Sequence, residues 1–235
     1  MVDFSQRLDK LELMDTSVCT DQEMIGALRF LKITNRYFGG CALILKILNV
    51  FSASWRTTET IKILDVGCGL ADIPLAIAQW AKSKNIKVEI TGLELVPQIA
   101  AFARENTREF PNILIEERNI LDLDESKNSY DYVIASLVLH HIFSEHCSAV
   151  LDKFNRLSNR GIIISDLERS WPAYAGITIL SYLIGNRIVR NDGPLSVQRS
   201  FTVRELKDLA HSLGLHYLKA QKESFFRLSL AGEKK

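Results

Sequence analysis

A short apolar run that ends in two glycines constrains the fold of this chain more than any other feature. Ile61 to Val66 has the branched side chains of a strand buried on both faces of a parallel sheet, and Gly67-Cys68-Gly69 follows it directly. A helical pattern then runs from about Ala71 to Lys82. Because glycine lacks a β-carbon, such a loop lets the backbone approach a ligand closely. The arrangement predicts a nucleotide-like cofactor here, although glycines also end strands for structural reasons alone.

Strand and helix patterns alternate after this loop. The expected order is strand 87–93, helix 97–110, strand 113–117, strand 130–136, helix 145–157 and strand 161–165. Such alternation implies crossover connections and a parallel sheet covered on both faces. After a helix at 203–213, strand-like runs at 215–221 and 224–230 are separated only by Lys222 and Glu223, which favours an antiparallel hairpin. We therefore predict an α/β fold with a doubly wound, mostly parallel seven-stranded sheet that ends in an antiparallel hairpin.

Two apolar stretches lie outside this alternation. Apolar residues recur at helical spacing from Gln22 to Phe51 with a break at Gly39-Gly40, which predicts a helical hairpin. A second apolar helix is expected from Tyr174 to Ile188, followed by a turn at Asn191-Asp192-Gly193-Pro194. The apolar runs in these segments are Cys41 to Phe51, which contains Lys46, and Ala173 to Val189, which contains Asn186 and Arg187. Each run falls short of the ~20 apolar residues that span a bilayer. We expect buried helices, with contact to a membrane surface as the alternative.

The composition of the chain limits the kinds of partner that we expect it to bind. The 29 Lys and Arg residues nearly balance the 28 Asp and Glu residues, and no basic stripe with interleaved aromatics is present, so we expect no nucleic-acid partner. The chain has four cysteines without a C-x-x-C pair, which favours reduced thiols. Residues 1–21 lack the order of a secretory signal. We expect a cytoplasmic monomer or homodimer that binds a small molecule and has no stable membrane insertion.

Acidic residues around the loop indicate which cofactor binds. Asp72 lies three positions after Gly69, where a dinucleotide fingerprint has a small residue, and an acid there suits a pyrophosphate badly. Asp65 suits a ligand with an ammonium group and a sulfonium. Glu94, at the end of the second strand, can accept hydrogen bonds from both ribose hydroxyls, or it is simply an exposed glutamate at a strand end. A NAD-dependent oxidoreductase is the alternative.

With these residues the chain resembles the class I S-adenosylmethionine-dependent methyltransferases, especially the small-molecule branch that includes quinone and polyketide methyltransferases. The resemblance covers roughly Ile61 to Asp166 and is most specific in Ile63-Leu64-Asp65-Val66-Gly67-Cys68-Gly69. The resemblance is also supported, less specifically, by Tyr130 to Ser136 together with Leu139-His140-His141. It implies a Rossmann-like fold, S-adenosylmethionine as cofactor, an N-terminal helical cap over residues 1–55, and a methyltransferase domain over residues 56–235 with a lid insertion at about 170–200. Ala71 replaces the third glycine of the family pattern, which leaves the tightness of the loop in doubt.

The resemblance also implies a set of cofactor contacts. The expected cofactor-binding residues are Asp65, Gly67, Cys68 and Gly69 at the methionine end, Glu94 and Leu95 at the ribose, Asn119 and Ile120 at the adenine, and Ser136 and Leu137 beside the methionine moiety. All of them follow strands that end at the carboxyl edge of the sheet, which is where ligands bind in open α/β folds.

Methyl transfer from a sulfonium requires an aligned, desolvated nucleophile that has lost its proton. His140 and His141 directly follow the fourth strand and are our catalytic candidates, although either one could merely pack or cap the next helix. We expect no metal site, because adjacent histidines point differently and no nearby acid completes a recognisable spacing. Asp166, Arg169 and Arg199 are the expected substrate-binding residues; an ion pair at a strand end is the alternative for the first two.

The sequence as a whole indicates methyl transfer to a small, hydrophobic or aromatic acceptor. A phenol or quinol oxygen is favoured, in the biosynthesis of a polyketide-, quinone- or lipid-like metabolite. Methylation at carbon or nitrogen of a related molecule is one alternative. A catalytically silent protein that binds the cofactor and acts as a regulatory or partner subunit is the other.

Overall fold

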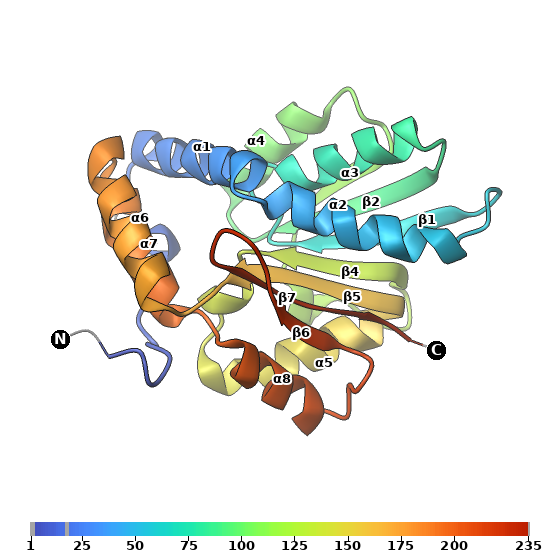
Figure 1. Cartoon of the computed structure of the whole chain (residues 1–235). Helices are drawn as coiled ribbons and strands as arrows, with labels where there is room; N and C mark the ends of the chain where they lie inside the picture. Colours follow the sequence, from blue (N-terminus) through green and yellow to red (C-terminus); the bar gives the residue numbers. More distant parts are fainter. Residues whose placement is uncertain (1–2, 17–18, 235) are drawn as a thin grey trace.

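A computed structural model describes residues 3–16 and 19–234 of the chain. Within them, seven strands form one sheet in the order β3-β2-β1-β4-β5-β7-β6 (Figure 1). The strands are β1 (Thr60–Val66), β2 (Lys87–Glu94), β3 (Ile113–Glu117), β4 (Tyr130–Ser136), β5 (Ser158–Leu167), β6 (Lys219–Lys222) and β7 (Arg227–Glu233). The pairs among β1 to β5 are parallel, whereas β7 is antiparallel to both β5 and β6. The predicted fold class is confirmed.

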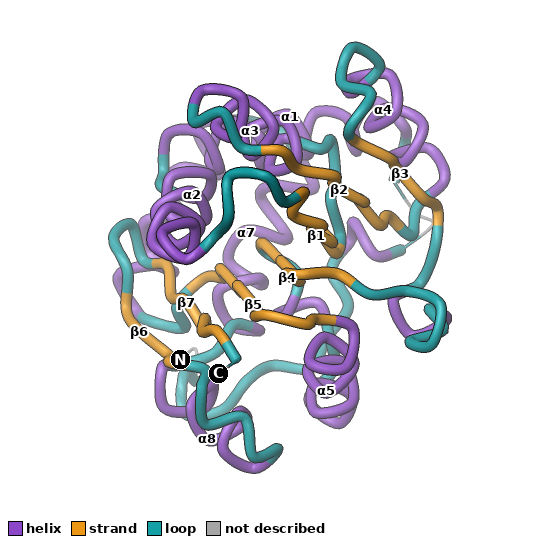
Figure 2. The backbone as a smooth tube through the Cα atoms, turned by 90° about the vertical axis from the view of Figure 1, so that its right-hand side faces the viewer, coloured by secondary structure: helices purple, strands orange, loops and turns teal. Residues whose placement is uncertain are grey.

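Helices cover both faces of this sheet (Figure 2). The α-helices of the described residues are α1 (Asp21–Tyr37), α2 (Gly40–Phe51), α3 (Asp72–Ser83), α4 (Pro97–Thr107), α5 (Cys147–Leu157), α6 (Trp171–Ile184), α7 (Arg187–Arg199) and α8 (Val203–Ser212). One hydrophobic cluster joins α2, α3 and α4 to the sheet, and a second joins α5 and α8 to the opposite face. Alternation along β1 places Ile61 and Ile63 in the first cluster and Leu64 and Val66 in the second. Burial on both faces explains why the strand reads as a continuous apolar run.

The predicted helical hairpin at residues 22–51 is wrong. The two helices α1 and α2 are bent by 48° at the break and do not fold back on each other. Gly39, with φ of 80°, redirects the chain. Ile44 and Leu48 of α2 are then fully buried against the sheet, so α2 belongs to the covering layer, whereas α1 continues beyond the carboxyl ends of the strands (Figure 1).

The predicted turn at residues 191–194 is also wrong, because these residues lie inside α7. Gly193 permits close packing against α6, since a β-carbon there would lie 2.8 Å from Ile177 Cγ1. Asp192 is buried, and its carboxylate accepts hydrogen bonds from the backbone N–H groups of Leu13 (2.8 Å) and Met14 (2.9 Å). Tertiary contacts therefore outweigh the helix-breaking preference of Pro194.

The last two strands form the predicted hairpin with a shifted turn. β7 begins at Arg227, so residues 223–226 make the connection instead of Lys222 and Glu223. Phe225 and Phe226 have φ values of 58° and 54°, which gives the turn the left-handed backbone that an antiparallel connection requires. The antiparallel pairing itself is as expected.

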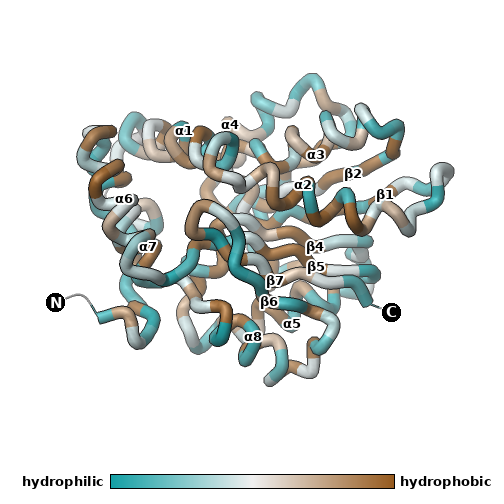
Figure 3. The backbone as a smooth tube through the Cα atoms, viewed as in Figure 1, coloured by the Kyte–Doolittle hydropathy of each residue, from teal (hydrophilic) through white to brown (hydrophobic). Residues whose placement is uncertain are grey.

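Helix α6 is the most apolar element outside the core (Figure 3). It occupies the region where a lid is predicted, and its outer surface exposes Ile179, Tyr182 and Leu183. Among the described residues, no single helix is long and apolar enough to cross a membrane; the bent pair Gln22–Tyr37 and Gly40–Ser54 meets the length and composition criteria when taken together.

Candidate active site

A cavity of about 850 Å³ lies at the carboxyl ends of β1, β2 and β4. The strand ends and the loops that follow them form one side, and residues 14–16 with α1 form the other. All ten predicted cofactor-binding residues line it: Asp65, Gly67, Cys68, Gly69, Glu94, Leu95, Asn119, Ile120, Ser136 and Leu137. The structure therefore brings together residues that span about 70 positions in the sequence; what each of them binds stays a prediction.

The glycine loop has the backbone that the sequence pattern demands. Gly67 and Gly69 have φ values of 67° and 54°. A β-carbon on Gly67 would lie 2.6 Å from Val138 Cγ2, whereas one on Gly69 would meet no atom within 4 Å, so Gly69 borders open space in the cavity. Ala71, at the position of the family's third glycine, has φ of 61° and directly precedes α3. The loop therefore keeps the glycine-like conformation at a cost of about 1–2 kcal/mol for the alanine.

Three acidic side chains give the cavity a negative potential. Asp65 is buried, and its Oδ2 has no hydrogen-bond partner among the described residues. Burial raises the pKa of Asp65 well above its usual value, and the charges of Asp72 and Glu94 raise it further. Burial also raises the pKa of Asp72, against the effect of a 2.9 Å hydrogen bond from Asn35 Nδ2. A cationic ligand would relieve this repulsion and supply the missing partner.

Glu94 connects the glycine loop to the end of β2. Its Oε2 accepts from Gly69 N at 3.0 Å, and its Oε1 accepts from Leu95 N at 2.8 Å and Val96 N at 3.1 Å. Three backbone donors hold the carboxylate at the cavity wall, where a ligand hydroxyl could donate to its remaining lone pairs. The alternative of an exposed glutamate does not apply, because Glu94 is buried.

Two polar groups complete the wall on the side of β3 and β4. The Asn119 side chain accepts from Leu121 N at 3.0 Å and so caps the short turn Ile120–Asp122. Ser136 Oγ is buried without a partner among the described residues. Leu137 has φ of 58°, a strained conformation for a leucine, at the point where β4 ends. Two of the five buried polar atoms without a partner among the described residues, on Asp65 and Ser136, thus belong to residues that line this cavity.

The two candidate histidines differ in their surroundings. Both belong to the short turn η4 (Leu139–His141), and their ring centroids are 4.3 Å apart. His140 is buried, with its Nδ1 2.5 Å from Asp166 Oδ1, and it does not line the cavity. His141 does line the cavity, and its Nδ1 lies 3.1 Å from Asp15 Oδ1.

The surrounding charges determine the protonation of His141. Burial lowers the pKa of His141, but the hydrogen bond to Asp15 and the charges of Glu12, Asp15 and Asp166 outweigh burial and raise the pKa to about 9. For Asp166, burial raises the pKa, but the contact with His140 outweighs it and leaves the pKa below its usual value. His141 therefore carries a positive charge at neutral pH and holds its proton too firmly to act as a base there.

The three predicted substrate-binding residues do not line the cavity. Asp166 contacts His140, as described. Arg169 donates to Ser200 O at 2.7 Å and to Glu205 Oε1 at 2.5 Å. Arg199 donates to the backbone oxygens of Lys10, His140 and His141. Each of the three is buried and bonded within the chain, which is the arrangement of a supporting network; their contact with substrate stays a prediction.

Sequence reasoning missed the N-terminal segment, residues 3–16. Met14, Asp15 and Thr16 line the cavity, and Glu12 lies buried behind them. No periodic pattern marks the segment, because it is held by contacts with residues more than 120 positions away, such as His141 and Asp192. Only the excess of acids in a short apolar stretch could have drawn attention to it.

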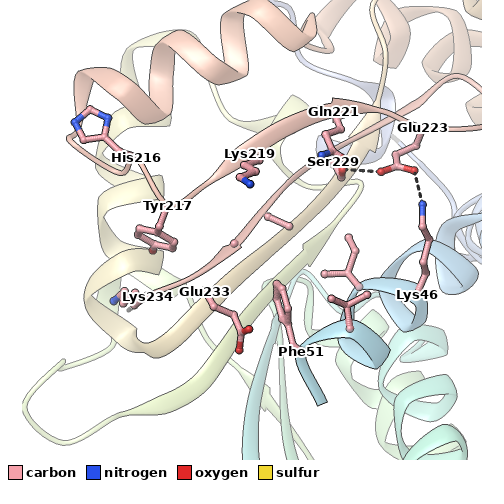
Figure 4. A pocket seen from close by; sticks show the side chains of 14 residues that line it. Lys46, Phe51, His216, Tyr217, Lys219, Gln221, Glu223, Ser229, Glu233 and Lys234 are labelled. Atoms are coloured by element: carbon pink, nitrogen blue, oxygen red, sulfur yellow. Dashed lines mark hydrogen bonds and ion pairs between the residues drawn. The ribbon is translucent and has the colours of Figure 1, made fainter. Parts of the chain in front are cut away.

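A second hollow, of about 950 Å³, lies between α2 and the β6–β7 hairpin (Figure 4). It contains none of the predicted site residues. Lys46 and Glu223 form an ion pair at one end of it, with a separation of 3.4 Å, and Ser229 Oγ donates to Glu223 at 2.9 Å (Figure 4). Because none of the predicted site residues lies there, whereas all ten predicted cofactor-binding residues line the first cavity, we place the candidate active site in the first cavity.

Comparison with known proteins identifies the family. The profile of the methyltransferase domain family matches residues 57–192, which is more than half of the chain. The chain belongs to this family, and the predicted resemblance to methyltransferases is confirmed.

Curated relatives match over part of their length. The demethylmenaquinone methyltransferase of Staphylococcus haemolyticus (strain JCSC1435) is 31% identical over 111 residues, which are 47% of this chain and 44% of that protein. The chain thus spans less than half the length of the curated relatives it matches.

Solved structures share the fold at low identity. A plantazolicin methyltransferase in complex with SAH has a TM-score of 0.67 with 13% identity over 92% of both chains. The magnesium protoporphyrin IX methyltransferase of Synechocystis PCC 6803 with bound SAH has a TM-score of 0.60 with 15% identity, over 92% of this chain and all of that one. These similarities establish a methyltransferase-type fold across the described chain.

Proposed function

We propose that this protein transfers a methyl group from S-adenosylmethionine to a small aromatic acceptor. The observation that carries the proposal is the buried Asp65, whose unpaired carboxyl oxygen lies at the cavity beside the glycine loop. When bound, S-adenosylmethionine supplies an electrophilic methyl group on a sulfonium. Its ammonium and sulfonium charges suit the region around Asp65, Asp72 and Glu94. The family membership and the SAH and SAM complexes of structural neighbours support the same cofactor.

Individual residues receive roles in cofactor binding under this proposal. Asp65 accepts a hydrogen bond from the ammonium group, and Glu94 accepts from the ribose hydroxyls. Gly69 leaves the space that the ligand occupies. Asn119 and Ile120 flank the adenine, and Ser136 Oγ, which has no partner among the described residues, binds near the methionine carboxylate.

The acceptor is hydrophobic or aromatic under this proposal. Apolar side chains from α1 and from the turns after β4 face the cavity: Met24, Leu28, Leu31, Val138, Ile142 and Phe143. Such a lining excludes water from the nucleophile and favours a flat ring over a hydrophilic amine. The curated relatives named demethylmenaquinone methyltransferases support a quinol or phenol. We favour its oxygen as the site of methylation, and methylation at carbon is the competing outcome.

His141 promotes the reaction through its charge. A cation beside a phenol lowers the pKa of the hydroxyl and favours loss of its proton to solvent, which leaves the phenolate as the better nucleophile. Asp15 fixes the imidazole orientation through Nδ1. His140 does not line the cavity and positions His141 from behind, anchored by Asp166.

Ligand binding and product analysis test the proposal. We expect S-adenosylmethionine and its demethylated product to bind the full chain in calorimetry, and NADH not to bind. Incubation with labelled cofactor and a panel of phenols, quinols and hydrophilic amines should label the aromatic acceptors, and mass spectrometry of the products separates oxygen from carbon methylation. Tight NADH binding without a response to S-adenosylmethionine would indicate an oxidoreductase, and cofactor binding without any transfer would indicate a silent partner protein.

A further inference from the structure

Three side chains from distant parts of the chain converge beside the cavity. Glu12 comes from the N-terminal segment, and His140 and His141 come from η4. One potential ligand atom of each lies within 4.8 Å of the other two. His140 Nε2 is 3.9 Å from Glu12 Oε1, and His141 Nε2 is 3.9 Å from Glu12 Oε2. Although the sequence predicts no metal site, because no acid lies near the histidines in the chain, Glu12 supplies that acid in the fold. We propose that these three residues bind a divalent metal ion of the zinc type.

The donor atoms that face away from the cluster support this site. His140 Nδ1 contacts Asp166 at 2.5 Å, and His141 Nδ1 contacts Asp15 at 3.1 Å. Metal-binding histidines nearly always place a carboxylate or carbonyl on the nitrogen that does not bind the ion, which orients the ring and increases its basicity. Both imidazoles have this arrangement, and the Nε2 atom of each points toward the carboxylate of Glu12. Two independent carboxylate–histidine pairs aimed at one acid point to an ion between them.

The geometry requires the three ligand atoms, which lie within 4.8 Å of one another, to move closer together. Zinc bonds of about 2.0–2.2 Å to nitrogen and oxygen in a tetrahedral site place neighbouring ligand atoms about 3.4 Å apart. The two nitrogen–oxygen separations here are 3.9 Å. Ser196 Oγ donates to Glu12 Oε1 at 3.0 Å, which holds the carboxylate in place and leaves Oε2 without a hydrogen bond from it. Side-chain rotations that shorten these separations would thus bring all three ligand atoms to bonding distance of one ion.

Charge also favours a divalent cation. The carboxylates of Glu12, Asp15 and Asp166 contact the two imidazoles, and Arg199 Nε lies 3.7 Å from Glu12. Glu12, His140 and Arg199 are buried. A buried excess of negative charge is costly unless cations balance it, and a divalent ion with Arg199 would match the three carboxylates. The ion would displace the proton that His141 carries in its absence, and it would then supply the positive charge beside the acceptor.

The nitrogen and oxygen donors select the kind of ion. Two imidazoles and one carboxylate suit zinc and similar transition metals better than Mg²⁺ or Ca²⁺, which prefer oxygen ligands throughout. Three protein ligands leave a fourth position for water or an oxygen of a bound molecule. Because His141 lines the cavity, this position lies next to the acceptor region. The ion would also fasten the N-terminal segment to η4 at the wall of the cavity.

The test is zinc binding by the full chain in the absence of cofactor and acceptor. After treatment with a chelator and its removal, calorimetric titration with Zn²⁺ should show one ion per chain, and titration with Mg²⁺ should show none. Glu12→Gln and His140→Gln should each abolish this binding. Asp15→Asn should weaken it by about 10- to 100-fold, because Asp15 only orients His141. Co²⁺ should give the visible absorption of a four-coordinate site in the parent chain and lose it in Glu12→Gln.

A second pair of histidines provides the matched control. His211 and His216 have ring centroids 5.2 Å apart on the surface, so His216→Gln removes a potential adventitious site and should leave the Zn²⁺ affinity unchanged. Circular dichroism establishes that each variant is folded. If Glu12→Gln does not fold, the weaker Zn²⁺ binding expected of Asp15→Asn provides the test instead. The proposal is overturned by the absence of Zn²⁺ binding, or by binding that His216→Gln removes and Asp15→Asn leaves intact. Neither result bears on methyl transfer, which is tested separately.

Discussion

Asp65 illustrates at the scale of a single residue how a binding site differs from a core. Its neighbours on β1 are buried apolar side chains, yet Asp65 is equally buried and keeps one oxygen unpaired among the described residues. A carboxyl group in such a place lowers stability, because neither water nor the protein satisfies it. The cost is understandable if a cationic ligand completes the site.

We expect Asp65→Asn to stabilise the protein without ligand and to weaken S-adenosylmethionine binding. The raised pKa means that protonated Asp65 favours the folded state at low pH, and this contribution is lost as pH rises through the folded-state pKa. Because asparagine does not ionise, the variant avoids that loss. Its free energy of unfolding should exceed that of the parent chain by about 1–3 kcal/mol at neutral pH. Urea unfolding at neutral and acidic pH measures this gain, which should shrink at acidic pH. The exposed Asp208→Asn, on α8 and outside the cavity, is the control, and reduced stability of Asp65→Asn with unchanged cofactor affinity would contradict our assignment.

Gly69 and Gly214 separate backbone strain from ligand contact. Both have positive φ, 54° and 71°, and a β-carbon on either would meet no atom within 4 Å. Gly69→Ala and Gly214→Ala should therefore each lower the free energy of unfolding by about 1–2 kcal/mol, since alanine is strained in this conformation. Only Gly69 lines the cavity. Calorimetry should show weaker cofactor binding for Gly69→Ala alone, and equal affinity of the two variants would remove Gly69 from the site.

At the scale of elements, sequence patterns predicted what local physics determines. The strands β1 to β5 follow from buried apolar runs, and the end of each strand placed Asp65, Glu94 and Ser136 at one edge of the sheet. Sequence patterns failed where contacts with distant residues determine the secondary structure. Gly193 and Pro194 predict a turn, yet packing on α6 keeps them helical. The N-terminal segment carries no pattern at all, so its part in the cavity wall could not be foreseen.

Asp192 should hold the N-terminal segment against α7. Its carboxylate accepts from the backbone N–H groups of Leu13 and Met14, next to Asp15 at the cavity. Asp192→Ala leaves both donors without their partner and should lower the free energy of unfolding by about 2–3 kcal/mol. Limited proteolysis should then cleave within residues 3–16 faster than in the parent chain.

Asp9→Ala is the matched control for this element. Asp9 also joins the segment to the body, through bonds of 3.3 and 3.2 Å to Ser144 N and Oγ, but these bonds are exposed. Loss of an exposed bond should change the cleavage rate little. If both variants are cleaved at the same rate, the segment is held by something other than Asp192.

At the scale of the whole molecule, one edge of the sheet gathers the residues that the function requires. The crossover connections bring the ends of β1, β2 and β4 to this edge, while α1 and the N-terminal segment close over it (Figure 1). A ligand in the cavity would therefore touch both the sheet and the elements that cover it. Its binding energy should stabilise the whole fold rather than one loop, because the unfolded chain has no such cavity.

This coupling yields a prediction that distinguishes the cofactors. At a concentration 100-fold above its dissociation constant, S-adenosylmethionine should stabilise the chain by about 2.7 kcal/mol, which for a domain of this size raises Tm by about 5–11 °C. NADH at the same concentration should leave Tm unchanged, because its pyrophosphate would meet Asp65, Asp72 and Glu94. Asp65→Asn should start from a higher Tm and respond less to S-adenosylmethionine. Differential scanning calorimetry measures all three, and a larger shift with NADH than with S-adenosylmethionine would refute the cofactor assignment, because the acidic cavity would then have failed to select the cation.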